Sequence, residues 1–196
     1  MLFKYLNRFK RAVKNKKIIS FLLIASYILG IVLGFILKGN TEDNIFYYFV
    51  INYRNIIFGL YANPIKLTFI RLINNLFSFL IIYLLCYSYF LIALNLIVFM
   101  YRGIILGSIA ILFIEVLGIQ GLIVFILLVI IQNLLVTLGL FFTTIIVYDL
   151  KSFCKKKYTD NVYLKYFLIG FIISIFAAIY ELILLLCFFR PLNIYF

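Results

Sequence analysis

Four polar residues lie inside long apolar stretches of this chain, and their side chains are the ones best able to do chemistry there. They are Arg102, the adjacent amides Gln132 and Asn133, and Glu181. Two neighbouring amides in hydrocarbon are costly unless they find hydrogen-bond partners. We therefore expect Gln132 and Asn133 to face the interior of a helical bundle and bond another helix. A role in lining a polar path is the alternative.

The two charged positions also allow a structural and a functional interpretation. An ionisable side chain within an apolar span marks a functional site by default. The simplest expectation for Arg102 is that it extends to the lipid headgroups, and the alternative is an acidic partner inside the bundle. Glu181 is predicted to be a functional carboxylate, a carboxylate at headgroup level, or the partner of Arg190 or Arg71.

The same residues argue against several kinds of enzyme. The chain contains no histidine, which excludes serine–histidine and cysteine–histidine catalysis. Cys86, Cys154 and Cys187 are isolated in sequence, so we expect no metal site and no cofactor. The acids inside predicted spans are Glu115 and Glu181, and both lie near the outer end. The chain is therefore predicted not to be an enzyme.

Composition places these residues in a membrane protein. Hydrophobic residues make up 67% of the 196 positions and charged residues 12%. Several apolar runs reach the ~20 residues that cross a bilayer as a helix. The fold class is therefore all-α, a polytopic transmembrane helical bundle with about five spans plus interfacial helices. Six spans is the alternative.

Positive charge gathers in two places and predicts the topology. Of 18 Lys and Arg residues, seven lie in residues 1–17 and five in 151–165. Basic loops mark the cytoplasmic side of a membrane protein. With four spans between the clusters, we expect a cytoplasmic N-terminus and an extracytoplasmic C-terminus. This charge indicates lipid contact and no nucleic acid.

The expected organisation is one membrane domain, 1–196. Residues 75–118 are divided into span two (about 75–92) and span three (about 96–116) with a turn near Asn95. One helix over 76–100, with span three starting at Gly103, is the alternative division. The full order is a basic amphipathic segment 1–17, span one 18–37, an outer interfacial segment 38–71, spans two and three 75–118, span four 122–147, a basic cytoplasmic loop 149–163 and span five 164–187.

Local signals mark several of the helix boundaries and contacts. The basic segment 1–17 has apolar residues at helical spacing, typical of an interfacial helix whose Lys and Arg meet anionic headgroups. A plain cytoplasmic anchor is the alternative. Gly30 and Gly34 have the spacing that lets another helix approach closely. Asn63 and Pro64 are a helix cap and a first helical residue, respectively.

With these segments placed, ten residues taken here as structural and assembly positions stand out by their order and spacing: Asn74, Asn75, Arg102, Gly103, Gly107, Gly118, Gly121, Gln132, Asn133 and Glu181. Through these residues the chain resembles the stage II sporulation protein M family of bacterial membrane proteins, which implies a location in the bacterial cell membrane. The chain departs from the family at Ile131 and near Pro191, where the family often has a proline before the amide pair and soon after the last-span acid.

The resemblance implies a function. It implies a non-enzymatic membrane scaffold in the septal membrane that localises two peptidoglycan hydrolases, sporulation proteins D and P, for engulfment of the forespore. The aromatic outer segment would dock such partners, and a homo-oligomer is left open. A transporter or channel subunit on the same fold is the alternative, with Arg102, Gln132, Asn133 and Glu181 along its route.

Overall fold

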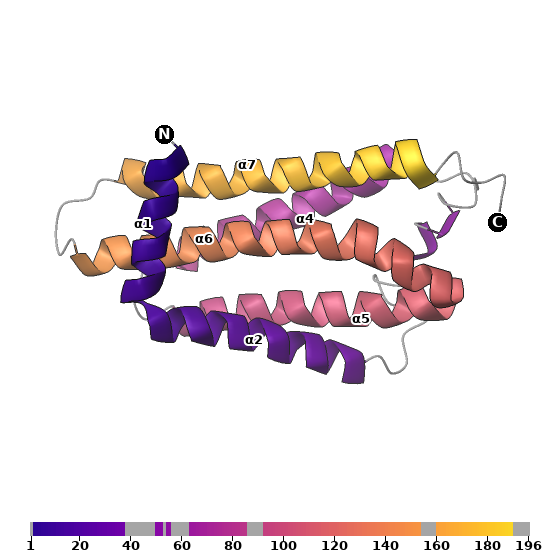
Figure 1. Ribbon diagram of the computed structural model, residues 1–196, viewed down its shortest axis with the longest axis horizontal. Coiled ribbons are helices and arrows are strands. Elements are labelled where there is room, and N and C mark those ends of the chain that lie inside the picture. The colour runs from indigo at the N-terminus through magenta and orange to yellow at the C-terminus, as the bar shows by residue number, and fades with distance from the viewer. Residues whose placement is uncertain are drawn as a thin grey trace.

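Helices make up all the regular structure in the part of the chain that the computed structural model describes, residues 2–37, 50–52, 54–55, 63–85, 92–153 and 160–189. Five helices have the length and apolarity to cross a membrane. The predicted all-α bundle is therefore confirmed (Figure 1). The helices are α1 (Leu2–Asn15), α2 (Lys17–Ile36), α4 (Pro64–Leu85), α5 (Ile92–Val124), α6 (Ile131–Phe153) and α7 (Asp160–Leu184), with π-helical segments η2 (Phe125–Ile130) and η3 (Leu185–Phe189).

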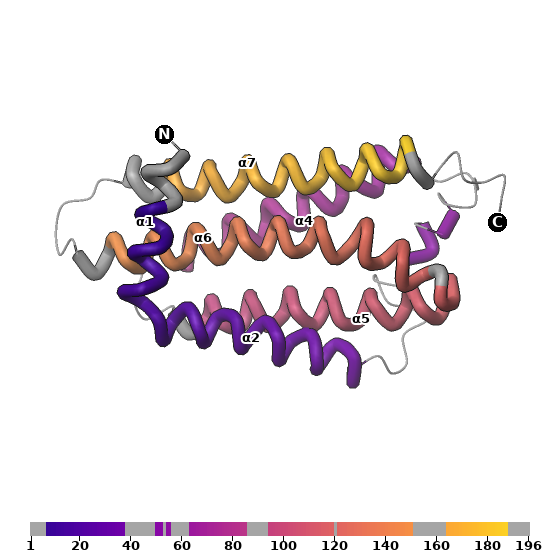
Figure 2. The backbone as a smooth tube through the Cα atoms, in the orientation of Figure 1, coloured from indigo at the N-terminus to yellow at the C-terminus, as the bar shows by residue number. Residues whose placement is uncertain are grey.

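The long helices α2, α4, α5, α6 and α7 run alongside one another and alternate in direction along the chain (Figure 2). The short helix α1 lies across one end of them, over α6 and α7 (Figure 1). We call this end of the bundle the α1 end and the opposite end the far end. Helices α2, α5 and α7 start at the α1 end, and α4 and α6 start at the far end.

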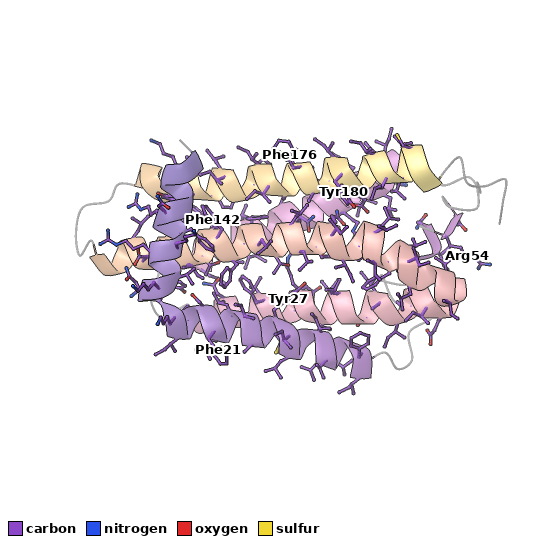
Figure 3. The ribbon with its side chains drawn as sticks, viewed as in Figure 1. Phe21, Tyr27, Arg54, Phe142, Phe176 and Tyr180 are labelled. Atoms are coloured by element: carbon purple, nitrogen blue, oxygen red, sulfur yellow. The ribbon has the colours of Figure 1, made fainter. Side chains whose placement is uncertain are left out.

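The outer surface of the bundle is apolar. Phe21 of α2 is 70% exposed and Phe176 of α7 is 65% exposed, and both point away from the bundle (Figure 3). Large exposed side chains of this kind occur on all five long helices. Such a surface would associate in water, and it suits the hydrocarbon of a bilayer. The chain is a multi-pass membrane protein.

The second long helix starts at the cap predicted from Asn63 and Pro64, earlier than the predicted span two. α4 begins at Pro64, so the predicted span two (75–92) and the outer segment (38–71) have the wrong boundary. The Asn63 side chain accepts hydrogen bonds from the amides of Ile65 and Lys66, at 3.0 and 3.4 Å. This cap and the proline at the first helical position start the helix there.

Little of the predicted outer segment belongs to the part that the structure describes. Residues 50–52 and 54–55 are helical, and Val50 is fully buried in the core. Arg54 is exposed and lies at the far end of the bundle (Figure 3). Residues 38–49, 53 and 56–62 lie outside the described residues. The described residues of this segment therefore include a buried side chain, Val50, and an exposed one, Arg54.

Residues 75–118 contain parts of two helices, as predicted, but the break is elsewhere. α4 ends at Leu85 and α5 begins at Ile92, which contradicts the alternative of one helix over 76–100. The predicted turn near Asn95 is also wrong, because Asn95 lies within α5. Its buried Nδ2 donates a hydrogen bond to the Tyr148 hydroxyl of α6 at 3.1 Å. This hydrogen bond provides a partner for the buried amide, so Asn95 can lie within the helix.

The chain turns at the far end between the predicted spans three and four. Gly118 has φ 64° and ψ −150° inside the run assigned to α5, a left-handed conformation that favours glycine. The chain reverses there. Gly121 follows it and packs against the backbone of Phe113. Both glycines are therefore turn positions, and the fourth span runs over Gly121–Leu150.

The predicted loop 149–163 is shorter than expected at both ends. α6 continues to Phe153 and α7 starts at Asp160, with 154–159 outside the described residues. Asp149 is buried, and its Oδ1 accepts a hydrogen bond from Asn15 of α1 at 3.1 Å. The number of charged residues near Asp149 in the sequence predicts a loop there. The hydrogen bond from Asn15 of α1 allows Asp149 to remain in α6.

Helix α1 has the amphipathic character expected of residues 1–17. Phe9 packs on Phe142 of α6, with ring centroids 5.2 Å apart, and Ala12 is fully buried. Arg8 lies over the Tyr166 ring of α7 and donates a hydrogen bond to its hydroxyl at 3.0 Å. The apolar face of α1 thus covers α6 and α7.

We expect the other face of α1 and the start of α2 to bind anionic lipid, because Lys10 and Lys14 of α1 and Lys17 of α2 are exposed. Each basic residue near an anionic surface contributes about 1 kcal/mol. The thermal stability of the reconstituted protein should rise with the anionic lipid fraction, and a triple Lys→Gln variant should lose this dependence. A triple Lys→Arg variant should keep it. Equal behaviour of the two variants would contradict the expectation.

Candidate functional site

Glycines hold α2 and α5 in backbone contact. Gly30 and Gly34 of α2 face Gly103 and Gly107 of α5, so that a Cβ atom at Gly34 would lie 3.0 Å from the Gly107 Cα. The hydroxyl of Ser108 donates a hydrogen bond to the Gly34 carbonyl at 3.3 Å. Small residues in two helices allow this approach in a membrane. Gly103 and Gly107 are packing positions, and the predicted close approach at Gly30 and Gly34 is confirmed.

Glu181 joins three helices. Its Oε1 accepts a hydrogen bond from Arg71 Nη1 of α4 at 2.7 Å, and its Oε2 accepts one from Gln132 Nε2 of α6 at 2.5 Å. The Glu181 side chain is 0% exposed. We call these three residues the Glu181 cluster. The structure thus selects Arg71 as the partner of Glu181, and it confirms that Gln132 bonds another helix.

The second amide of the predicted pair has a local role. The Nδ2 of Asn133 donates to the carbonyl oxygen of Val129 in its own helix, at 2.9 Å. Val129 lies in η2, whose wider turns change the face that the following residues present. Gln132 comes directly after this segment and is buried, while Asn133 is half-buried. The predicted interhelical bond of Asn133 is not observed.

Arg102 is also inside the bundle. It is 8% exposed, and its Nη2 donates a hydrogen bond to Asn75 Oδ1 of α4 at 2.9 Å. The expectation that it reaches the headgroups is wrong, and its partner is an amide in place of the predicted acid. Asn75 is buried whereas Asn74 is exposed, so only one residue of that asparagine pair belongs to the site.

The inward side of α4 connects these contacts. Thr68, Arg71 and Asn75 are three and four positions apart, which places them on one face of the helix. Thr68 is buried and its hydroxyl has no hydrogen-bond partner. Sequence reasoning missed this face, although the spacing was visible. We call Thr68, Arg71 and Asn75 the α4 polar row.

Two hydroxyls continue the polar interior beyond Arg102. The hydroxyl of Tyr27 in α2 is buried and interacts electrostatically with Arg102. It also lies near Thr137 of α6. Figure 3 shows Tyr27 between α2 and α6. Neither hydroxyl was expected to take part, because tyrosine and threonine are common in apolar spans and nothing in the sequence sets these two apart.

These side chains can bind and orient charge within the bundle. The Glu181 cluster and Arg102 together bring two guanidinium groups and one carboxylate into the interior, and Arg71 and Arg102 interact electrostatically. Within the described ranges, no three His, Cys, Asp or Glu side chains form a group able to hold a metal ion. The chemistry available is hydrogen bonding and electrostatic attraction.

Known proteins give no further guide to this site. No protein-family model, no characterised protein and no solved structure matches the chain. The resemblance to the stage II sporulation protein M family therefore stays a prediction. A functional proposal must therefore be based on the buried polar side chains and on the two ends of the bundle.

Proposed function

We propose that the chain is a non-enzymatic membrane scaffold that localises peptidoglycan hydrolases during spore development. The observation that carries the proposal is that buried polar groups connect helices. Glu181 links α4, α6 and α7, and Arg102 links α4 and α5. Such contacts fix the relative positions of helices, which is what a platform for other proteins requires.

The docking face in this proposal is the far end of the bundle. The basic α1 end would be cytoplasmic by the positive-inside rule, so the far end would face the cell wall. Val50 is buried there and anchors its segment to the core. Arg54, a few residues on, is exposed (Figure 3). Partners would dock on the exposed side of this segment, because its buried side packs on the core of the bundle.

A transporter or channel subunit is the second candidate, and the α4 polar row favours it. These residues lead from near the start of α4 toward its middle. Arg102 and the Tyr27 hydroxyl continue the row across the bundle. Polar side chains inside a membrane bundle commonly mark a solute or ion pathway.

A crosslinking pull-down from sporulating cells tests the scaffold. We expect the tagged protein to capture a peptidoglycan hydrolase identified by mass spectrometry, and to lose it when residues 41–62 are replaced by a Gly/Ser segment of equal length. Replacing 154–159 in the same way is the matched control and should retain capture. The scaffold proposal fails if wild type captures no wall hydrolase. If the protein in liposomes also passes ions or solutes, and Gln132→Leu abolishes that flux, the second candidate is correct.

A further inference from the structure

One amide side chain lies on the outer surface of the bundle, at the centre of a membrane-spanning helix. Asn74 of α4 is exposed, whereas the next residue, Asn75, is buried and bonds Arg102. α4 has 22 residues, and Asn74 lies ten positions after Pro64 and eleven before Leu85. The exposed charged side chains described on the long helices, in contrast, all lie near the end of a helix or span: Lys17, Lys66, Glu115 and Lys165.

The described residues provide no hydrogen-bond partner for the Asn74 amide. The hydroxyl of Ser78 contacts this residue, but it donates to the backbone carbonyl of Asn74, at 3.1 Å. Asn133 of α6 differs, because its amide bonds a carbonyl of its own helix. The hydrocarbon core is ~30 Å thick, so water and headgroups lie about 15 Å from its centre. An unpaired amide at that depth is strongly unfavourable.

Asn74 belongs to a stripe of residues along α4. The stripe consists of Ile70, Asn74, Phe77, Ile81 and Leu84, which alternate in spacing between four and three positions. Every member is exposed or half-buried, and Phe77 is 62% exposed. This spacing is that of a helix that packs on a parallel helix in a left-handed coiled coil. We call these five residues the α4 outer stripe.

We propose that the α4 outer stripe binds a second copy of this chain, with the two Asn74 amides hydrogen-bonded to each other. Two copies with the same topology have Asn74 at the same depth, and a two-fold axis along the membrane normal makes their α4 helices parallel. A carboxamide both donates and accepts, so each Asn74 can supply what the other lacks. Such bonds between helices stabilise their association in a membrane. The proposal does not depend on the scaffold function.

Förster energy transfer between donor-labelled and acceptor-labelled full-length protein in liposomes, over a series of protein-to-lipid ratios, measures the association. We expect wild type to associate, and Asn74→Leu should raise the dissociation constant at least about tenfold, which corresponds to ~1.4 kcal/mol. Asn74→Gln keeps a carboxamide and should retain most of the association. Asn133→Leu is the matched control, since it removes an amide that has its partner in its own helix. It should leave the dissociation constant unchanged.

Cysteine crosslinking tests the geometry of the pair. In protein whose three native cysteines are replaced by serine, Phe77→Cys should give a disulfide-linked dimer in liposomes, because the two stripes meet along the axis. Phe176→Cys is the matched control, since Phe176 of α7 is 65% exposed and points away from the bundle (Figure 3). It should stay uncrosslinked.

Three results would overturn the proposal: wild type that is monomeric at every ratio, association that is unchanged in Asn74→Leu, or crosslinking of Phe176→Cys in place of Phe77→Cys. The first would show that the Asn74 amide has no partner from a second copy. The second and third would assign the contact between copies to another face. If Asn74→Leu fails to fold, the two cysteine variants decide.

Discussion

Replacement of Glu181 by glutamine is expected to lower the free energy of unfolding by about 3–5 kcal/mol. The substitution keeps the size of the side chain but removes the carboxylate that balances Arg71 across α4 and α7. Because Glu181 is fully buried, water cannot replace the lost charge. The unfolding midpoint in mixed detergent micelles, titrated with a denaturing detergent, measures the effect.

Glu115→Gln is the matched control, since it makes the same chemical change at an exposed position of α5. Its effect should stay below about 1 kcal/mol. The double variant Arg71→Leu/Glu181→Leu should be more stable than either single leucine variant, because neither charge is then left buried alone. Comparable stability of Glu181→Gln and Glu115→Gln would show that the ion pair does not hold the bundle together.

The spans could be predicted because the membrane leaves few choices. Backbone groups in hydrocarbon must bond within the segment, so a long apolar run is a helix. The turn at Gly118 and the glycine spacing in α2 were also visible, because each depends on residues close together in sequence. These features required no knowledge of which helices become neighbours.

The helix start at Pro64 was predicted from Asn63 and Pro64, but the extension of the second span through Arg71 and the location of Arg102 could not be predicted in this way. Arg71 lowers the average hydropathy of its segment, which argues against a membrane span there. Its partner Glu181 lies 110 positions later in the chain. Arg102 is retained inside by Asn75, 27 positions earlier. Such pairings depend on tertiary packing. The one available local signal was the spacing of Thr68, Arg71 and Asn75 on one face of α4.

Gly103→Ala is expected to separate α2 from α5. A Cβ atom at Gly103 would collide with the backbone carbonyl oxygen of Tyr27 and lie 2.8 Å from the amide nitrogen of Ile31. Backbone atoms cannot rotate away as a side chain can, so α2 as a whole must move. Overpacking of this kind costs about 1–3 kcal/mol, measured by the same detergent titration.

Gly139→Ala makes the same chemical change where the structure can adjust. Its Cβ would lie 3.2 Å from the ring of Phe79, a side chain, and at least 3.4 Å from the other nearest atoms. The higher helix propensity of alanine, worth up to about 1 kcal/mol, offsets that contact, so the variant should stay near wild-type stability. Equal effects at the two glycines would contradict backbone contact between α2 and α5.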